Sequence, residues 1–172
     1  EKIPLTVRAI INRGGEQGAQ HSQSLASWFA HVPGLRVVMP STPSDARDLL
    51  IAATLCDDPV LYIDDRWCYD REETLSPIKE INLTKEGTVQ RRSGNDVTLV
   101  GYSFCAWQCE QASDQLAGHG VECDVFDLRV VNPLCLDAIF ESVAKTGKLL
   151  IAEGDWGPCG IGGEIIAKCA EQ

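Results

Sequence analysis

Apolar residues along the chain form two successive series of short segments in which strand-like and helix-like spacings alternate. In the first series, runs rich in β-branched and other apolar residues predict strands at residues 3–11, 35–39 and 59–63. The spacing between these runs predicts a short helix with Ser22 or Ser24 as its N-cap and a longer helix with Thr42 or Ser44 as its N-cap. Strands that alternate with helices imply a parallel sheet covered on both faces, so we expect the rest of this sheet to lie outside the chain.

The second series follows a stretch without clear periodicity. Strands are predicted at residues 97–102, 121–126 and 148–152. One helix is predicted between the first two strands, and a second starts at Asn132-Pro133 and ends at Thr146-Gly147, which gives a βαβαβ unit with a mostly parallel sheet. The prediction is an α/β fold with a first lobe at residues 1–70, a linker at 71–95 that includes one short strand near 87–90, and a second lobe at 96–172.

Composition narrows the class of protein. With 172 residues, 44% of them hydrophobic and 23% charged, the chain is typical of a globular protein with one domain or two small lobes. Lobes of this size have marginal cores, so self-association is expected. The longest apolar runs are far shorter than the roughly 20 residues that cross a bilayer, and the N-terminus lacks the pattern of a signal peptide. We therefore expect a soluble, cytoplasmic protein without a membrane partner, and the start at Glu1 suggests a trimmed or excised N-terminus.

Charge and cysteine content exclude further classes. The net charge of −10 disfavours nucleic-acid binding, which depends on clustered Lys and Arg; it fits either a basic protein partner or a solvated acidic surface. The cysteines lie inside apolar segments and are predicted to be buried free thiols, without the Cys-x-x-Cys pairs of a zinc site. They are Cys56, Cys68, Cys105, Cys109, Cys123, Cys135, Cys159 and Cys169.

The strongest candidate for chemistry is His21, which follows the glycine-rich stretch 14–18 after the first predicted strand. Ligands of open α/β sheets bind beyond the carboxyl ends of the strands, and Gln20 and Gln23 add hydrogen-bonding groups there. If His21 lies at the start of the following helix, the positive helix end favours neutral imidazole, which suits proton transfer to an oxyanion. The competing interpretation is a surface histidine that only forms local hydrogen bonds.

Three other features are weaker candidates for chemistry. The segment Gly160–Ile165 lacks the last glycine of the dinucleotide-binding pattern G-x-G-x-x-G and follows the third strand of its lobe, so NAD or FAD binding is not predicted. His31 lies beside Pro33 at a predicted helix end, where a hydrogen bond to its own backbone is expected. His119, between two glycines, is expected to be exposed.

One long stretch is similar to a known protein family. His21-Ser22-Gln23-Ser24 and the segment Trp28–Pro40 resemble the beta subunits of pyruvate and branched-chain 2-oxo-acid dehydrogenases, which belong to the transketolase-like superfamily. Further matching segments cover nearly the whole chain: Asp45–Leu50, Asp58-Pro59-Val60, Asp127-Leu128-Arg129, Asn132-Pro133-Leu134, Thr146-Gly147 and Gly162–Ile165. The resemblance implies that the first lobe is the last portion of a pyrimidine-binding domain, and that the second lobe is most of a transketolase C-terminal-type domain.

The resemblance also implies an activity. The intact enzyme would use thiamin diphosphate and magnesium to decarboxylate a 2-oxo acid and transfer the acyl group to lipoamide, with His21 as catalytic residue and Gln20 and Ser22 beside it. Pyruvate, branched-chain and acetoin-type substrates all fit this family. In the family the metal-diphosphate site lies on the alpha subunit and the activating Glu lies upstream of Glu1. No thiamin-binding residue is therefore assigned to this chain, and the fragment alone is expected to be inactive.

Two kinds of partner follow from the same resemblance. The alpha subunit is one. The other is the small basic subunit-binding domain of the acyltransferase core, expected near Glu153, Asp155 and Glu164. Related beta subunits also bind potassium through backbone carbonyls. The segments that match these ligands contain Leu5, Thr6, Ala53, Cys56 and Asp58.

Two alternative functions stay open on the sequence. Transketolases and deoxyxylulose-phosphate synthases share these domains, although their loop usually reads Thr-His-Gln where this chain has Gln20-His21-Ser22. The other alternative is an assembly or interaction module that keeps the second lobe and has no thiamin chemistry.

Overall fold

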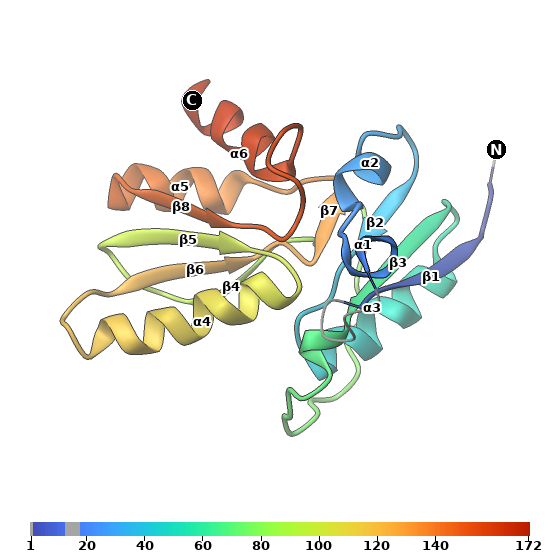
Figure 1. Cartoon of the computed structure of the whole chain (residues 1–172), viewed down its shortest axis with the longest axis horizontal. Coiled ribbons are helices and arrows are strands. Elements are labelled where there is room, and N and C mark those ends of the chain that lie inside the picture. The colour runs from blue at the N-terminus through green and yellow to red at the C-terminus, as the bar shows by residue number, and fades with distance from the viewer. Residues whose placement is uncertain (1, 13–17) are drawn as a thin grey trace.

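The computed structural model describes residues 2–12 and 18–172, which form two lobes side by side (Figure 1). The glycine-rich stretch 13–17 lies outside the described residues. The strands are β1 Thr6–Ile11, β2 Arg36–Val38, β3 Val60–Asp65, β4 Val89–Arg92, β5 Val97–Gly101, β6 Cys123–Asp127, β7 Val130–Asn132 and β8 Leu149–Ala152. The helices are α1 Ala19–Ser22, α2 Ala26–Ala30, α3 Pro43–Leu55, α4 Phe104–Ala117, α5 Asp137–Thr146 and α6 Ile161–Ala170, with a 3-10 turn η2 at Arg66–Cys68.

The first sheet has the strand order β1-β3-β2-β7. Strands β1 and β2 both pair with β3 in parallel, with Thr6 and Arg36 on either side of Val60. The fourth strand, β7, comes from the second half of the chain and pairs antiparallel with β2. The predicted parallel lobe is therefore present, and the second lobe completes one edge of its sheet.

The second sheet has the order β4-β6-β5-β8, with β5 parallel to both β6 and β8. Helix α4 lies on one side of this sheet and α5 on the other (Figure 1). This arrangement confirms the predicted βαβαβ unit and its mostly parallel sheet. Strand β4 lies in the predicted linker, close to the expected short strand, and pairs antiparallel with β6.

Helix α3 begins as its sequence predicts. The Thr42 hydroxyl accepts a hydrogen bond from the backbone N–H of Asp45, and Pro43 is the first helical residue, where a missing N–H costs nothing. The expected serine cap of the preceding helix is wrong. Leu25 is the N-cap residue of α2, and its side chain makes no capping hydrogen bond. Ser24 instead forms a parallel β-bridge with Asp155 of the second lobe.

Helices α1 and α6, the turn η2 and strand β7 were not predicted, and the predicted helix start at Asn132-Pro133 is wrong. Helix α6 was not predicted, because three glycines surround its start. The short strand β7 was also missed, since three residues are too few to show a period. The Asn132-Pro133 peptide bond is cis, and helix α5 begins only at Asp137.

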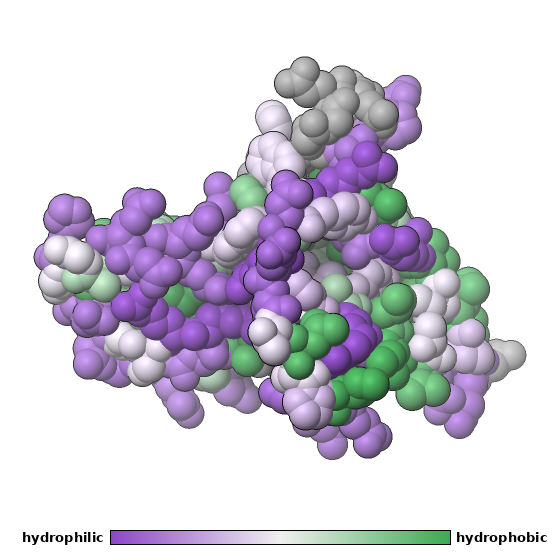
Figure 2. Space-filling model, turned by 90° about the horizontal axis from the view of Figure 1, so that it is seen from below, coloured by the Kyte–Doolittle hydropathy of each residue, from purple (hydrophilic) through white to green (hydrophobic). Residues whose placement is uncertain are grey.

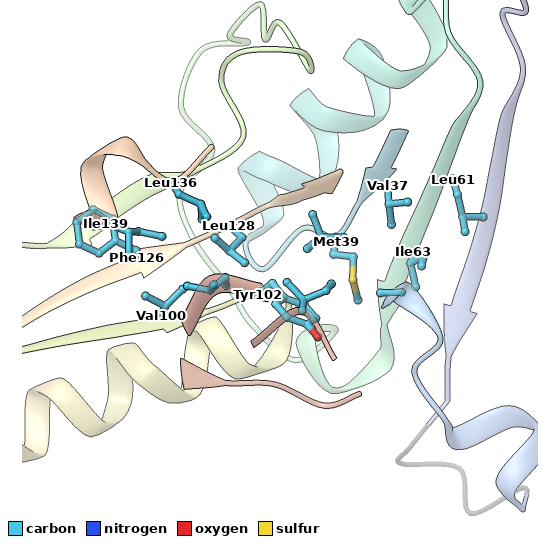
Figure 3. Close-up of a cluster of buried hydrophobic side chains, with 14 of the residues drawn as sticks. Val37, Met39, Leu61, Ile63, Val100, Tyr102, Phe126, Leu128, Leu136 and Ile139 are labelled. Atoms are coloured by element: carbon cyan, nitrogen blue, oxygen red, sulfur yellow. The ribbon is translucent and has the colours of Figure 1, made fainter. Parts of the chain in front are cut away.

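One hydrophobic core connects the lobes. Val37, Leu61 and Ile63 from the first sheet form a continuous cluster with Val100 and Phe126 from the second (Figure 3). Met39 and Tyr102 lie where the two groups meet, as Figure 3 shows. Alternate residues of β3 point to opposite faces, so Val60 and Tyr62 pack with Leu49 of α3 in a separate cluster.

The surfaces of the two lobes differ in character. On the face shown in Figure 2, hydrophobic residues gather on the right half of the view, over the first lobe, whereas the visible face of the second lobe is mainly hydrophilic. Most of the large exposed hydrophobic side chains precede residue 80, including Leu5, Val7, Ile10 and Trp28. Among the described helices, none is both long enough and apolar enough to span a membrane.

Candidate functional site

His21 lies just beyond the carboxyl end of β1, where the sequence predicted a ligand-binding residue. Its carbonyl oxygen accepts a hydrogen bond of 2.7 Å from the backbone N–H of Asn12, the residue that follows β1. The neighbouring Ser22 hydroxyl donates to the carbonyl oxygen of Asn12 at 3.3 Å. The end of β1 therefore fixes the backbone of α1, and Ser22 contributes to that contact.

The expected position of His21 at a helix N-terminus is wrong. His21 lies in the last turn of α1, which has only four residues. So short a helix sums few peptide dipoles, and His21 is not at its positive end. The helix-dipole argument for a neutral imidazole therefore has no structural basis here.

The His21 side chain is exposed and lines a cavity of about 470 Å³. Residues of β1 and β3 and the apolar side chains of Leu25 and Phe29 line the same cavity, together with Gln20 and Gln23. Successive side chains of a strand point to opposite faces of the sheet. One wall of the cavity is formed by the side chains of β1 and β3 that lie on the face opposite α3. Among the described residues that line this cavity, His21 is the one ionisable group. The arrangement can exchange one proton inside a largely apolar hollow.

A second hollow, of about 630 Å³, is lined in part by Asn12. Arg66 and Trp67 line it from η2, Tyr69 lines it from the C-cap of η2, and Phe104 lines it from the start of α4. These residues were not predicted as site residues. Position was the available signal for Arg66, Trp67 and Tyr69, because they come just after β3 at the carboxyl edge of the first sheet, whereas Phe104 comes after β5 of the second sheet.

The two segments expected to hold potassium come together. The Thr6 hydroxyl donates to the carbonyl oxygen of Ala53 at 2.8 Å, and the same oxygen accepts from the backbone N–H of Cys56 at 3.3 Å. The carbonyl oxygen of Leu5 accepts from the N–H of Val60 at 2.8 Å. The Asp58 side chain pairs with Arg36 at 2.6 Å, so its backbone is the part left for a cation. These oxygens already have protein partners, and a cation would use their remaining lone pairs.

Two of the three acidic residues expected to contact a partner are used inside the chain. Glu153 accepts a hydrogen bond of 2.9 Å from the backbone N–H of Gly162 at the start of α6. Asp155 accepts hydrogen bonds from the backbone N–H and the hydroxyl of Ser27, at 2.9 and 2.6 Å. Glu164 is exposed. The expected acidic docking surface is therefore reduced to Glu164 at this position.

The remaining candidates have mixed outcomes. His119 is exposed, as predicted, and His31 is the exposed C-cap residue of α2. None of the eight cysteines forms a disulfide, which confirms that part of the prediction, but only Cys105, Cys109 and Cys123 are buried. No group of three or more His, Cys, Asp or Glu side chains suited to a metal ion occurs within residues 2–12 and 18–172.

Comparison with known proteins identifies two domain families. The family model of the transketolase pyrimidine binding domain matches residues 1–67, and that of the transketolase C-terminal domain matches residues 86–172. Among solved structures, a split-gene transketolase described as an inactive beta4 tetramer has a TM-score of 0.83 at 21% identity. That match covers 99% of this chain and 55% of the transketolase chain, and at this identity it shows the fold alone.

Curated relatives are beta subunits of oxidoreductases. The beta subunit of acetoin:2,6-dichlorophenolindophenol oxidoreductase from Cupriavidus necator is 36% identical, with 99% of this chain and 50% of the relative covered. The beta subunit of 2-oxoisovalerate dehydrogenase from Bacillus subtilis is 38% identical, with coverages of 98% and 51%. The mitochondrial pyruvate dehydrogenase E1 component subunit beta from Dictyostelium discoideum is 39% identical, with coverages of 90% and 44%.

The chain thus spans about half the length of the curated relatives it matches. Both domain matches agree with the two lobes of the structure and with the order of the sheets. This chain belongs to the transketolase family, with a pyrimidine-binding-domain segment followed by a transketolase C-terminal domain.

Proposed function

We propose that this chain is part of the beta subunit of a thiamin-diphosphate-dependent 2-oxo-acid dehydrogenase, which decarboxylates a 2-oxo acid and transfers the acyl group to lipoamide. The observation that carries the proposal is His21, the one ionisable group among the described residues that line an apolar cavity at the carboxyl end of β1. Relatives of 36–39% identity that are named as beta subunits of such oxidoreductases support the same assignment.

The residues present fit the reacting side of a thiamin site. Thiamin diphosphate, when bound with magnesium, supplies the stabilisation of carbanion character that 2-oxo-acid decarboxylation requires. The cavity beside His21 offers an apolar wall, and His21 is the proton-exchanging group among the described residues that line it. The magnesium and the diphosphate would be held by the alpha subunit, as the resemblance to the family implies.

The contribution of this chain is the management of one proton and the exclusion of water. His21 exchanges a proton with an oxygen atom of the substrate-derived group, for which an imidazole is suited near neutral pH. Gln20 adds a hydrogen-bonding group on the same cavity wall, and Ser22 ties the backbone of α1 to Asn12. Phe29 and Leu25 keep that wall apolar, which strengthens any hydrogen bond formed inside it.

The proposal includes a potassium ion bound between the start of β1 and the end of α3. Backbone oxygens of Leu5, Thr6, Ala53, Cys56 and Asp58 would supply its ligands, as carbonyl oxygens suit a hard monovalent cation. The bond between the Thr6 hydroxyl and the Ala53 carbonyl supports it, because it brings these two segments together in this structure.

The proposed partners follow from the surfaces. The alpha subunit would cover the apolar surface of the first lobe, since exposed hydrophobic patches of this kind mark interaction sites. The net charge of −10 and the exposed Glu164 favour the basic subunit-binding domain of an acyltransferase core as a second partner. Self-association through the second lobe and a cytoplasmic location complete the proposal.

Activity of the assembled enzyme tests the proposal. The full-length protein would be co-expressed with its candidate alpha subunit and assayed with pyruvate, 2-oxoisovalerate and acetoin, with His21→Ala and His119→Ala compared in parallel. We expect turnover of pyruvate or 2-oxoisovalerate, a loss of about 100- to 10,000-fold in His21→Ala, and no loss in His119→Ala. Turnover of acetoin alone would replace 2-oxo-acid decarboxylation by acetoin cleavage. Running the same assay in KCl and in NaCl at equal ionic strength tests the potassium site.

Each negative result has a distinct meaning. Turnover that survives in His21→Ala would remove the proposed role of that residue. Absence of turnover with all three substrates, together with ketol transfer between sugar phosphates, would reassign the protein to transketolase-type chemistry. Inactivity toward both substrate classes would favour a non-catalytic assembly role.

A further inference from the structure

Asp155 connects the second lobe to the segment that contains His21. It follows β8, and its Oδ2 atom accepts hydrogen bonds from the backbone N–H of Ser27 at 2.9 Å and from the Ser27 hydroxyl at 2.6 Å. The backbone of Asp155 also forms a parallel bridge with Ser24. Two residues of the His21 segment are thus attached to a residue 128 positions from Ser27 in sequence.

Asp155 replaces the cap that α2 lacks. The N-cap residue of α2 is Leu25, whose side chain cannot accept a hydrogen bond, so the first N–H groups of this helix have no local side-chain partner. Ser27 is the second helical residue, and its N–H is the group that an N-cap side chain normally binds. A carboxylate that accepts from this N–H and from the adjacent hydroxyl forms charge-assisted bonds, which are stronger than neutral ones.

The surroundings of Asp155 make these bonds strong. Its Oδ1 atom is buried, and so are the hydroxyl oxygens of Ser24 and Tyr102. Burial raises the pKa of Tyr102, and the negative charges of Asp155 and Glu153 raise it further. The carboxylate therefore acts in a region of low dielectric, where hydrogen bonds to a charged group are strengthened.

His21 lies between two anchors of the chain. On one side its carbonyl oxygen is bonded to the N–H of Asn12. On the other side, beyond the contact of Ser22 with Asn12, the next contacts with a distant segment are those of Ser24 and Ser27 with Asp155, three and six residues after His21. Helices α1 and α2 are only four and five residues long and cannot be stable by themselves. The position of the imidazole therefore depends on both anchors, and the second one comes from the other lobe.

We infer that Asp155 is a positioning residue that holds His21 in place from the other lobe. Its effect on catalysis rests on the proposed function, whereas its effect on the order of residues 19–31 does not. A loosened anchor displaces His21 from its working geometry, and a displacement of about 1 Å can cost on the order of 100-fold in rate.

Hydrogen exchange measured by mass spectrometry tests the anchor without any activity. The full-length protein with its alpha subunit would be compared with the variants Asp155→Ala, Asp155→Asn and Ser27→Ala. We expect amides within residues 19–31 to exchange on the order of tenfold faster in Asp155→Ala, with smaller changes in Ser27→Ala and in Asp155→Asn, which keeps an acceptor oxygen. Glu141→Ala, which removes an exposed carboxylate from α5, is the matched control and should leave these amides unchanged.

A double-mutant cycle tests whether the anchor acts through His21. In the wild-type background we expect Asp155→Ala to lower kcat by about 10- to 100-fold with a smaller change in KM, and Asp155→Asn to recover part of the loss. In the His21→Ala background the same change should cost less than about twofold, because the residue being positioned is already gone.

The hydrogen-exchange and kinetic measurements test separate parts of the proposal. Unchanged exchange at residues 19–31 in both Asp155→Ala and Ser27→Ala would overturn the positioning role, whatever the activity. Equal losses of kcat in the two backgrounds would overturn action through His21. A wild-type complex without activity would remove the proposed function, and the exchange experiment would still decide the role of Asp155.

Discussion

Arg91 is the residue on which the buried charges between the lobes depend. Its guanidinium donates to Oδ2 of Asp127 at 2.7 Å and also to the carboxylate of Asp45. Asp127 is fully buried and accepts a further hydrogen bond from Ser41 at 2.5 Å. Burial raises the pKa of Asp127, and Arg91 opposes that increase. Burial would also raise the pKa of Asp45, but the charges of Arg91 and Arg129 lower it below its ordinary value.

Replacing Arg91 by methionine should destabilise the protein by about 3–5 kcal/mol, because two buried carboxylates lose their shared counter-charge. Arg92 provides the matched control on the same strand. Its partners Asp114 and Glu122 are exposed, and an exposed ion pair contributes about 1 kcal/mol or less. Urea unfolding followed by circular dichroism measures both variants. Equal losses in Arg91→Met and Arg92→Met would contradict the role given to the buried network.

At the scale of elements, Asp124 connects three parts of the second lobe. It lies on β6, and its Oδ2 atom accepts from Ser142 and Lys145 of α5, each at 2.6 Å. Its Oδ1 atom accepts from Gln90 of β4. Burial would raise the pKa of Asp124, but the hydrogen bonds from Lys145, Ser142 and Gln90 lower it below its ordinary value. The carboxylate therefore fixes α5 and β4 against the sheet in its charged form.

The variant Asp124→Asn should lose roughly 1–3 kcal/mol of stability near pH 7. A carboxyl group whose pKa is lowered by folding contributes stability above its unfolded pKa of about 3.9, and that contribution is lost as pH falls through the folded value. The difference between wild type and Asp124→Asn should therefore be constant from about pH 7 to pH 5 and shrink below about pH 4. Urea midpoints along this pH series measure it, with Glu141→Gln on α5 as the control. A difference that does not change with pH would show that Asp124 acts through packing alone.

A helix or strand can be predicted from sequence when its own residues show a periodic pattern of apolar positions. Strands β3 and β5 and helices α3 and α4 have several periodic residues each, and they form close to where the sequence places them. Helix α6 was missed because its glycines are poor helix formers. The glycines at its start leave room for Glu153, whose Oε1 atom would lie 2.6 Å from a Cβ at residue 160 and 3.0 Å from one at residue 162. At this position the low helix propensity of the glycines is offset by the hydrogen bond that Glu153, from another segment, accepts at the start of the helix.

The candidate site follows the same rule. His21 could be selected from sequence because a glycine-rich turn and a strand end precede it directly. The sequence did not predict on which side of the sheet His21 lies, that it lies within α1 and not at a helix start, or that Asp155 helps to position it. These features arise from contacts between segments that are distant in sequence, and one sequence does not show which distant segments meet.

At the scale of the whole molecule, the two lobes are joined by more than the chain that connects them. Strand β7 extends the first sheet, and Val130 on β7 is fully buried against Val38 and Leu49 of the first lobe. Arg71, at the start of the linker, forms a bidentate pair with Glu110 of α4 at 2.7 and 3.1 Å and donates to the carbonyl oxygen of Ser41 in the first lobe at 3.4 Å, so it connects both lobes. The shared core and these contacts imply that neither lobe keeps its packing when the other unfolds.

The chain should therefore unfold as one cooperative unit. Val130→Ala leaves a small cavity in the cluster beside α3 and should cost about 2 kcal/mol. If the lobes are one unit, the slowest amides of both β3 and β5 should exchange faster by the same factor in this variant, since both open only in global unfolding. Val125→Ala, in the core beside α4, is the matched change in the second lobe and should produce the same pattern. The contrary result is that Val130→Ala accelerates exchange only in β3 and α3, while Val125→Ala accelerates it only in β5 and α4. In that case the lobes are separate folding units, and Asp155 connects His21 to a lobe that can unfold independently.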